Sequence, residues 1–261
     1  MASRKPKQRG RDIDEVLRQW PFRPGVIMAR KVQASDGREV VQMRVEMGIL
    51  QMETEHRPDG TRPGGANTYL DYVARRAARH GPDFVLSARQ CAEMDREFLQ
   101  YYHRRICWLA LREFERAVGD ADHTLAMMDF ATRHSPSPEW TLSHEQYRPL
   151  VLFHRTQAAA LAELDQSGPE AAIEAIAEGL VRLRSALAAS EMEEDLPDER
   201  HPLVEQLVEL QEWIREHFEV GKTLSEQLAE AVAAEQYELA ARLRDEIARR
   251  RASDPKQRGK A

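Results

Sequence analysis

Residues 222–250 read KTLSEQLAEAVAAEQYELAARLRDEIARR, and this stretch decides the fold of the C-terminal part of the chain. Apolar residues recur in both halves at spacings of three and four, the period of one helix face: Leu224, Leu228 and Ala231, then Ala240, Leu243 and Ile247. The pattern breaks near Glu235-Gln236, which predicts two short helices joined as a hairpin. So small a unit buries little apolar surface, so we expect it to pair with a second copy or with the helix before it.

The segment before the hairpin continues the same pattern. Its apolar residues share the phase of the hairpin: Leu203, Leu207, Leu210 and Ile214. This predicts a linking amphipathic helix over 198–220 whose coiled-coil-like seam runs into the hairpin. His217 occupies one slot of the seam, where we expect a packed or solvent-tipped histidine rather than a metal ligand.

Residues 222–250 resemble the UvrB/UvrC (UVR) motif, a short helical hairpin found in those two excision-repair subunits and in some regulators of Clp-type proteases. The resemblance rests on residues at the defining positions of the motif: Leu224, Leu228, Ala231, Glu235, Tyr237, Ala240, Ala241, Leu243, Arg244, Asp245 and Ile247. Tyr237 departs from the motif, which more often has phenylalanine there. The resemblance implies that residues 221–252 dock onto a like hairpin, in another protein or in a second copy of this chain as a homodimer.

The expected partner-binding residues belong to the apolar face, to the turn and to the charged positions off that face: Leu224, Leu228, Tyr237, Ala240, Leu243, Arg244, Asp245 and Ile247. Ala240 permits close approach of the two helices. Arg244 and Asp245 lie off the apolar face, where we expect charged contacts with another hairpin. Tyr237 at the turn is expected to offer an exposed ring for recognition.

Composition and charge bound the remaining function classes. Of the 261 residues, 42% are hydrophobic and 31% are charged, and the net charge is −6. This balance is typical of a soluble globular protein and argues against nucleic-acid binding by the whole surface. The basic tails at 1–11 and 249–261 are expected to be solvated, with nucleic-acid contact as the alternative. No apolar run approaches the roughly eighteen residues of a membrane span, so we expect a cytoplasmic protein without a membrane partner.

No catalytic, cofactor or metal signature occurs in the sequence. The histidines are scattered, and Cys91 and Cys107 lie too far apart along one predicted helix to bridge, which favours reduced thiols and leaves no zinc site. Glycine-rich phosphate loops and a nucleophile elbow do not occur. We therefore expect a protein that is not an enzyme, with no catalytic residues, no metal site and no cofactor.

The N-terminal part has a strand pattern. Residues 26–34 (VIMARKVQA) and 38–53 (REVVQMRVEMGILQME) flank Asp36-Gly37, and apolar residues alternate with polar ones in the second segment. This predicts a β-hairpin with a tight connection. Gly48 interrupts the second strand, where we expect a bulge or close packing.

The loop HRPDGTRPGG, residues 56–65, follows the β-hairpin and is rich in turn-forming residues. We expect a structured Ω-type loop. The alternative is an anion site formed by Arg57, Asp59 and Arg62.

The rest of the chain is predicted to be helical near 67–79, 87–118, 120–134, 141–165, 169–190 and 201–219. Residues with capping side chains stand near the expected helix starts: Ser87, Asp120, Ser143 and Asp198. Pro169 stands early in its helix, where a missing N–H is tolerated.

The middle of the chain resembles a tetratricopeptide-type helix pair. Residues 101–129 carry the resemblance, with large packing residues, a turn and small or apolar residues on the second helix: Tyr101, Trp108, Glu113-Phe114, Ala117 and Leu125. Residues 150–183 repeat it weakly, at Ala172, Gly179 and Leu180. The offset from Ala117 to Ala172 does not match the repeat period of about 34 residues, which favours stacked helical hairpins without strict periodicity. Core packing is the expected role of these residues, and a peptide groove is the alternative.

The sequence therefore predicts a mostly α fold of tetratricopeptide-like helical hairpins, with an N-terminal β-hairpin and a C-terminal UVR-type hairpin. Its expected parts are a basic tail and short helix (1–20), the β-hairpin and RPDG loop (21–66), the helical body (67–197), the linking helix (198–220), the UVR-type hairpin (221–252) and a basic tail (253–261). We expect a non-enzymatic adaptor for protein–protein interaction. The alternatives are a nucleic-acid-binding factor associated with nucleotide excision repair and a regulator of a Clp-type protease.

Overall fold

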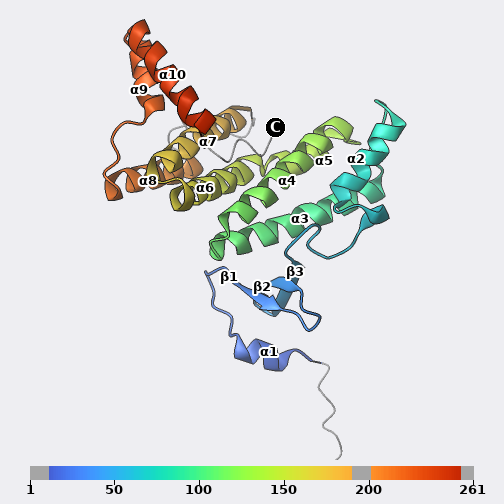
Figure 1. The fold of residues 1–261 in the computed structure, drawn as a ribbon. Coiled ribbons are helices and arrows are strands. Elements are labelled where there is room, and N and C mark those ends of the chain that lie inside the picture. Colours follow the sequence, from blue (N-terminus) through green and yellow to red (C-terminus); the bar gives the residue numbers. More distant parts are fainter. Residues whose placement is uncertain (1–11, 190–200, 254–261) are drawn as a thin grey trace, which may run out of the picture. The chain divides into compact units, whose positions relative to one another are not determined.

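The computed structural model of the chain describes residues 12–189 and 201–253. The described residues form a mostly helical protein with one three-stranded antiparallel sheet and a C-terminal helical hairpin (Figure 1), which confirms the predicted fold class. The chain divides into two compact units, Met1–Val151 and Leu152–Ala261. The terminal basic segments 1–11 and 254–261, and the proposed cap Asp198, lie outside the described residues.

The first unit contains the sheet and the helices up to the start of α6. Its elements are α1 (Asp14–Gln19), β1 (Met28–Gln33), β2 (Glu39–Val45), β3 (Gly48–Glu53), η1 (Pro63–Gly65), α2 (Tyr69–His80), α3 (Ala88–Ala110), α4 (Phe114–His134) and α5 (Pro138–Glu145). The strands are ordered β1-β2-β3, each antiparallel to the next. β1 and β2 form the predicted hairpin, and Gly37 in their connection has a φ of 86°, a conformation that glycine adopts without strain.

The predicted second strand is two strands rather than one. Val45 pairs with Gly48, which leaves Glu46 and Met47 as a tight turn, with Met47 88% exposed. Gly48 therefore begins β3 and is not a bulge. The Arg44 guanidinium stabilises the turn, because its Nη1 donates to the carbonyl oxygens of Val45, Glu46 and Gly48. A side chain from β2 thus supports a tight turn that has no glycine or asparagine at its two central positions.

Both faces of the sheet are covered. Val40 and Val41 point to opposite faces, because successive strand residues alternate, and both are fully buried. Trp20, which follows α1, accepts a hydrogen bond at its carbonyl oxygen from Arg44 Nε at 2.8 Å, and the Arg30 guanidinium lies 4.1 Å from the centre of its indole ring. β1 and β2 also pack against α3.

α3 and α4 are packed against each other as an antiparallel pair (Figure 1). α3 ends at Ala110, earlier than predicted, and Arg112 in the turn has a φ of 60°. Phe114 begins α4, where the tetratricopeptide-like pattern places the turn. Asp120 is not a cap, because it lies inside α4, is buried and forms an ion pair with Arg104. Sequence spacing cannot distinguish these two uses of an aspartate.

The predicted helix over 141–165 is divided into α5 and α6 (Arg148–Gln166). Ser137 caps α5, since its side chain accepts a hydrogen bond from the backbone N–H of Trp140 at 3.3 Å. Ser143 lies inside α5 and donates to the Trp140 carbonyl oxygen at 2.7 Å, so its predicted capping role was wrong. Ser87 precedes α3 as predicted, and the Gln90 side-chain oxygen accepts from its backbone N–H at 2.8 Å.

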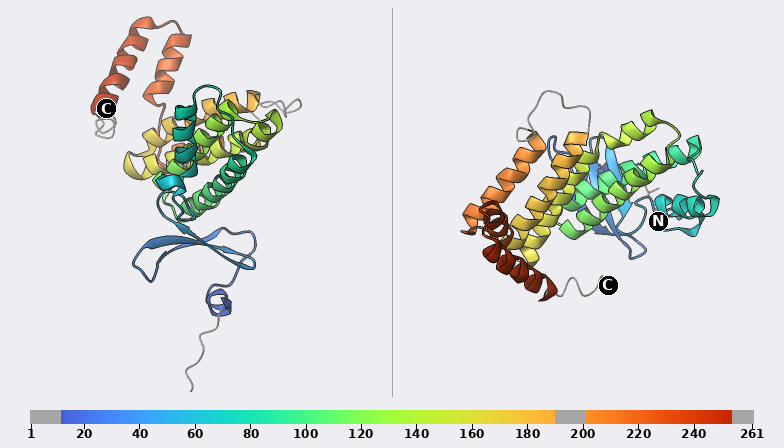
Figure 2. Two further views of the ribbon diagram at one scale, coloured as in Figure 1. Left: turned by 90° about the vertical axis from the view of Figure 1, so that its right-hand side faces the viewer. Right: turned by 90° about the horizontal axis from the view of Figure 1, so that it is seen from above.

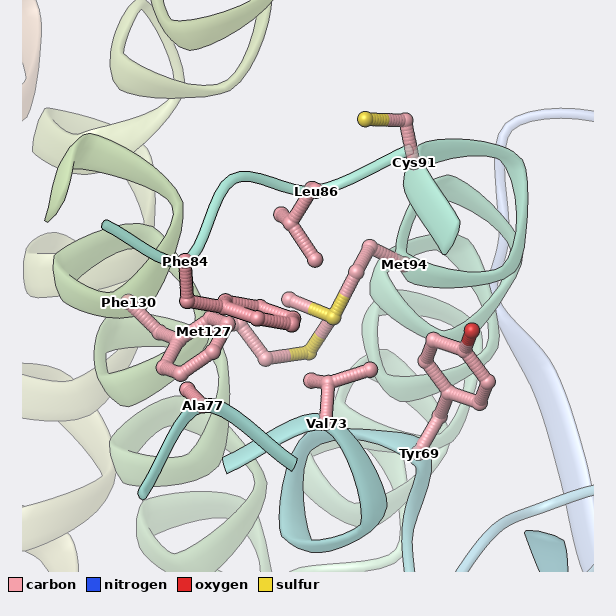
Figure 3. Close-up of a cluster of buried hydrophobic side chains, with 9 residues drawn as sticks. All are labelled: Tyr69, Val73, Ala77, Phe84, Leu86, Cys91, Met94, Met127 and Phe130. Atoms are coloured by element: carbon pink, nitrogen blue, oxygen red, sulfur yellow. The ribbon is translucent and has the colours of Figure 1, made fainter. Parts of the chain in front are cut away.

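An apolar cluster joins α2, α3, α4 and the segment before α3 (Figure 3). Its buried members are Tyr69, Val73, Ala77, Phe84, Leu86, Cys91, Met94, Met127 and Phe130. The side chains of Met94 and Met127 meet in its centre, next to Val73 and Phe84 (Figure 3). Flexible thioethers suit such a junction of three helices, because they fill irregular gaps. Cys91 and Cys107 are both buried free thiols.

The described part of the second unit is helical. It contains α6 from Leu152 onward, α7 (Pro169–Ala189), α8 (Pro202–His217), α9 (Leu224–Ala233) and α10 (Tyr237–Ser253). Pro169 is the first residue of α7, as predicted, and Gly168 before it has a φ of 98°. Gly179 of α7 faces Thr156 of α6, whose side chain a Cβ on Gly179 would overlap. Glycine at this position therefore lets the two helices approach closely.

No helix in residues 12–189 or 201–253 combines the length and the apolar content needed to cross a bilayer.

Candidate functional site

α9 and α10 form an antiparallel helical hairpin (Figure 2), as the spacing of apolar residues predicts. The hairpin begins at a capping box: Thr223 Oγ1 accepts from the backbone N–H of Glu226 at 3.3 Å, and Glu226 Oε2 accepts from the backbone N–H of Thr223 at 2.8 Å. This reciprocal pair satisfies two N–H groups that a helix start leaves without partners. Thr223 is buried, so the box is also the packed base of the hairpin.

Arg215 connects this base to α8. Its Nη2 lies 2.7 Å from Glu226 Oε1, and its Nη1 donates to the Gly221 carbonyl oxygen at 2.8 Å. Glu226 therefore serves two roles, as a helix cap with one oxygen and as an ion-pair partner with the other. Together these contacts set where the hairpin begins after α8.

The turn between the helices lies at Glu235-Gln236, as predicted. Glu235 has a φ of 56°, the left-handed conformation that commonly ends a helix, although glycine is the more usual residue there. Its backbone N–H donates to the Val232 carbonyl oxygen at 3.0 Å, and that of Gln236 donates to the Ala231 carbonyl oxygen at 2.8 Å. Tyr237 then begins α10.

The facing sides of the two helices meet at small residues. Ala231 and Ala240 are 3% and 8% exposed. The larger aliphatic residues of the predicted face are each partly exposed: Leu224, Leu228, Leu243 and Ile247. Alanines let the helices approach closely, but they contribute little apolar burial. The hairpin therefore holds its shape while part of its aliphatic surface stays in contact with solvent.

The polar and aromatic candidates lie on the outside of the hairpin. Tyr237 is 69% exposed at the turn. The side chains of Arg244 and Asp245 are 72% and 63% exposed, and Arg244 Nη2 lies 3.0 Å from Asp245 Oδ1. An exposed ion pair contributes little free energy in water. Arg244 and Asp245 can therefore give up their mutual contact and each bind a charged group of a partner protein. A shallow hollow at the turn is lined by Glu235, Gln236, Tyr237, Glu238, Leu239 and Arg242.

Two exposed apolar residues of the hairpin are absent from the sequence-based set. Val232 of α9 is 53% exposed and Leu239 of α10 is 44% exposed. Each stands four residues from a predicted face residue, Val232 from Leu228 and Leu239 from Leu243, so both border the apolar face. The sequence does contain a signal for these two residues. With them, the apolar face of each helix is wider than the face needed to pack against the other helix of the hairpin.

His217 lies outside the apolar packing at the end of α8. It is exposed, and its ring stacks on Trp213 with centroids 5.0 Å apart and planes at 9°. Trp213 is 51% exposed and Phe218 is 44% exposed, so aromatic surface also borders this end of α8. His217 is therefore solvent-exposed, which is one of the two environments that the sequence predicts for it.

The alternative anion site in the loop 56–65 is not formed, because its charges are used within the protein. Arg57 is 3% exposed, and its Nη2 donates to Glu93 Oε2 at 3.0 Å while Nη1 donates to Thr61 Oγ1 at the same distance. Arg62 donates to the Asn67 side chain, and Asp59 accepts from the Thr61 backbone at 2.9 Å. These contacts hold the structured loop that the sequence predicts.

Within residues 12–189 and 201–253, no three His, Cys, Asp or Glu side chains are grouped so that they could hold a metal ion.

Comparison with known proteins identifies one part of the chain. The family model described as the UvrB/uvrC motif matches residues 220–252. This range contains all of α9 and all but the last residue of α10. The predicted UVR motif at the C-terminus is therefore confirmed. No curated protein and no solved structure matches the chain.

Proposed function

We propose that the protein is a cytoplasmic, non-enzymatic adaptor that docks through its UvrB/UvrC motif onto a like hairpin, carried by a partner protein or by a second copy of this chain. The motif is a helical hairpin for protein interaction, and it occupies residues 220–252 here. The proposed contact residues come from its apolar face, its turn and the charged pair on its outer side: Leu224, Leu228, Tyr237, Ala240, Leu243, Arg244, Asp245 and Ile247.

One observation carries this proposal. The hairpin buries alanines between its helices, while its leucines and its isoleucine stay partly exposed and Tyr237 stands 69% exposed at the turn. Val232 and Leu239 extend the apolar surface on either side of the turn. An exposed aromatic anchor next to aliphatic surface, with charged groups at the rim, is the usual composition of a protein-binding site.

Association of the full chain tests the proposal. Sedimentation velocity measures self-association, and calorimetric titration with purified UvrB measures docking onto a protein that carries the motif. We expect at least one of the two to show specific binding. Tyr237→Ala should weaken that binding at least about tenfold, because an anchoring aromatic contributes roughly 2 kcal/mol or more.

Tyr147→Ala is the matched control, because Tyr147 is 47% exposed and lies in the first unit, outside the hairpin. It should leave the affinity within about twofold, since truncation of a residue outside an interface is nearly neutral. If Tyr237→Ala and Tyr147→Ala lose the same affinity, Tyr237 is not an anchor of the interface. A chain that neither self-associates nor binds UvrB would contradict docking onto a like hairpin.

A further inference from the structure

The first unit contains a cleft of about 660 Å³ that the proposed function does not use. One wall is the exposed side of α2, the other is the first turns of α3, and the loop 56–65 borders one end. The residues that matter for its chemistry are Arg57, Tyr72, Arg76, Val85, Arg89 and Glu93. Its volume falls within the range of roughly 300–1,000 Å³ that is usual for small-molecule sites.

The lining is positively charged, in a chain whose net charge is −6. Three arginines line the cleft against one glutamate, and that glutamate is already engaged, since Glu93 Oε2 accepts from Arg57 and Oε1 from Arg96 at 2.9 Å. Arg76 and Arg89 are exposed and have no ion-pair partner among residues 12–189 and 201–253. The cleft therefore presents two unneutralised guanidinium groups.

The position of α3 adds to this charge. α3 is 23 residues long and begins at Ala88, so its positive dipole end lies beside the cleft. Ser87 and Gln90 at this helix start line the cleft as well. An anion that enters the cleft would meet both the exposed guanidinium groups of Arg76 and Arg89 and the partial positive charge of the helix start.

The walls of the cleft are held in place by the loop 56–65. The buried guanidinium of Arg57 joins this loop to α3 through its hydrogen bond to Glu93. Gly64 packs against the Tyr72 ring so closely that a Cβ there would lie 2.7 Å from a ring carbon. The Arg76 guanidinium lies 5.7 Å from the centre of the same ring. Loop, ring and guanidinium thus form one packed wall rather than three independent surface groups.

The apolar part of the lining is also accessible. Val85 is 57% exposed, and Tyr72 is partly exposed. A bare inorganic ion would contact the arginines but leave this surface unused. A ligand that combines an anionic group with a ring or a short hydrocarbon part would contact both kinds of lining.

We propose that this cleft binds a small organic anion, a phosphate ester or carboxylate with a ring or short hydrocarbon part. The anionic group is held by Arg76 and Arg89, and the apolar part lies against Tyr72 and Val85. Guanidinium groups suit this role because they recognise both phosphate and carboxylate through paired hydrogen bonds.

Calorimetric titration of the full chain with phenyl phosphate, benzoate and inorganic phosphate tests the cleft. We expect saturable one-to-one binding of phenyl phosphate or of benzoate, tighter than that of inorganic phosphate. Preference for the first identifies phosphate esters as the ligand class, and preference for the second identifies carboxylates. Arg76→Gln and Arg89→Gln should each weaken binding about tenfold, the loss expected for a charge-assisted contact.

Arg75→Gln is the matched control, because it removes the same charge from an exposed position of α2 that does not line the cleft. It should change the affinity less than about twofold, as expected for a screened surface charge. Equal effects of Arg75→Gln and Arg76→Gln would show general electrostatic attraction and overturn the site. The proposed site would also be overturned if neither phenyl phosphate nor benzoate saturates the protein at concentrations up to roughly 10 mM.

Discussion

Arg104 of α3 binds Asp120 of α4 through two parallel hydrogen bonds, from Nε to Oδ2 at 2.9 Å and from Nη2 to Oδ1 at 2.7 Å. Both side chains are buried. The remaining nitrogen, Nη1, donates to the carbonyl oxygens of Glu53 at 2.9 Å and of His56 at 2.8 Å. One guanidinium therefore holds the helix pair together and attaches the end of β3 to it.

Arg104→Met should destabilise the protein strongly. The substitution leaves a buried carboxylate on Asp120 without its guanidinium partner and removes one donor from the carbonyl oxygens of Glu53 and His56. The His56 oxygen keeps a second donor, the Tyr101 hydroxyl at 3.0 Å. Breaking a buried ion pair by removing one partner typically costs about 3–5 kcal/mol. Urea unfolding followed by circular dichroism measures the loss, and a change below about 1 kcal/mol would show that the pair contributes little.

Arg105→Met is the contrasting substitution at the next residue. Arg105 is 1% exposed, and in the described part of the chain its guanidinium donates to Thr124 Oγ1 at 3.0 Å but has no ion-pair partner within 4 Å. Burial lowers the pKa of Arg105 to about 10, although the charge of Asp120 acts in the opposite direction. Thr124 keeps a partner without it, since its hydroxyl donates to the Asp120 carbonyl oxygen at 2.7 Å.

Arg105→Met should therefore leave the free energy of unfolding unchanged or raise it by about 1 kcal/mol, because it removes a buried charge and orphans no buried group. The same urea unfolding measurement applies. A loss as large as that of Arg104→Met would mean that Arg105 has a stabilising role that its contacts do not account for.

Two helical glycines should respond in opposite directions to alanine. Gly179→Ala places a methyl group against the Thr156 side chain, so α6 and α7 must separate. We expect a loss of about 1–3 kcal/mol, as for other overpacked cores. Gly119→Ala in α4 meets no atom within 4 Å and should raise stability by roughly 0.5–1 kcal/mol, because alanine favours the helix. Thermal unfolding of the two variants measures both changes. If both substitutions destabilise the protein, the close approach of Gly179 to Thr156 is not the cause of the loss in Gly179→Ala.

The ion pair between Glu145 and Arg148 should make stability depend on pH. Arg148 donates to both Glu145 carboxylate oxygens, at 2.5 and 2.9 Å. Burial alone would raise the pKa of Glu145, but the hydrogen bonds and charge of Arg148 outweigh it and hold this pKa below its ordinary value. The stabilisation is therefore fully present above the unfolded-state value of about 4.3 and is lost as the pH falls through the lower folded-state pKa.

Glu145→Gln should accordingly lower the free energy of unfolding by about 1 kcal/mol at pH 7, a modest amount because both side chains are about one-quarter exposed. The difference between the native protein and the variant should shrink as the pH is lowered from 5 to roughly 3. Urea unfolding across this range measures it. A difference that stays constant or grows towards acid would exclude a stabilising carboxylate at this position.

Leu243→Asp should unfold the hairpin. Leu243 is partly buried on the face that α10 turns towards α9, and a carboxylate there would lose hydration without gaining a partner. We expect a loss of helicity by circular dichroism. Leu239→Asp is the control on the same helix: Leu239 is 44% exposed, so helicity should persist while association weakens. Equal loss of helicity in both variants would show that Leu239 belongs to the packing of the hairpin and not to a contact surface.

The sheet shows where prediction from sequence succeeded and where it failed. The connection at Asp36-Gly37 carries turn chemistry, and the strands β1 and β2 follow from it. The second turn, at Glu46-Met47, has no such signal. It depends on the Arg44 side chain, which reaches three carbonyl oxygens of the turn. A turn stabilised by a side chain is invisible to rules that consider backbone preference alone.

The sequence by itself determined the UVR-type hairpin, because the residues that specify its two helices and its turn are close together along the chain. The apolar spacing, the capping pair Thr223 and Glu226, and the break at Glu235-Gln236 all lie within residues 220–252. The tertiary structure alone decided the partners of the charged residues. Asp120 became the partner of Arg104 rather than a helix cap, and Arg57 became the support of the cleft at α2 and α3. A helix face is visible in the sequence because its residues recur every three or four positions. The pairing of charges, by contrast, depends on which distant segments the folded core brings within hydrogen-bond distance.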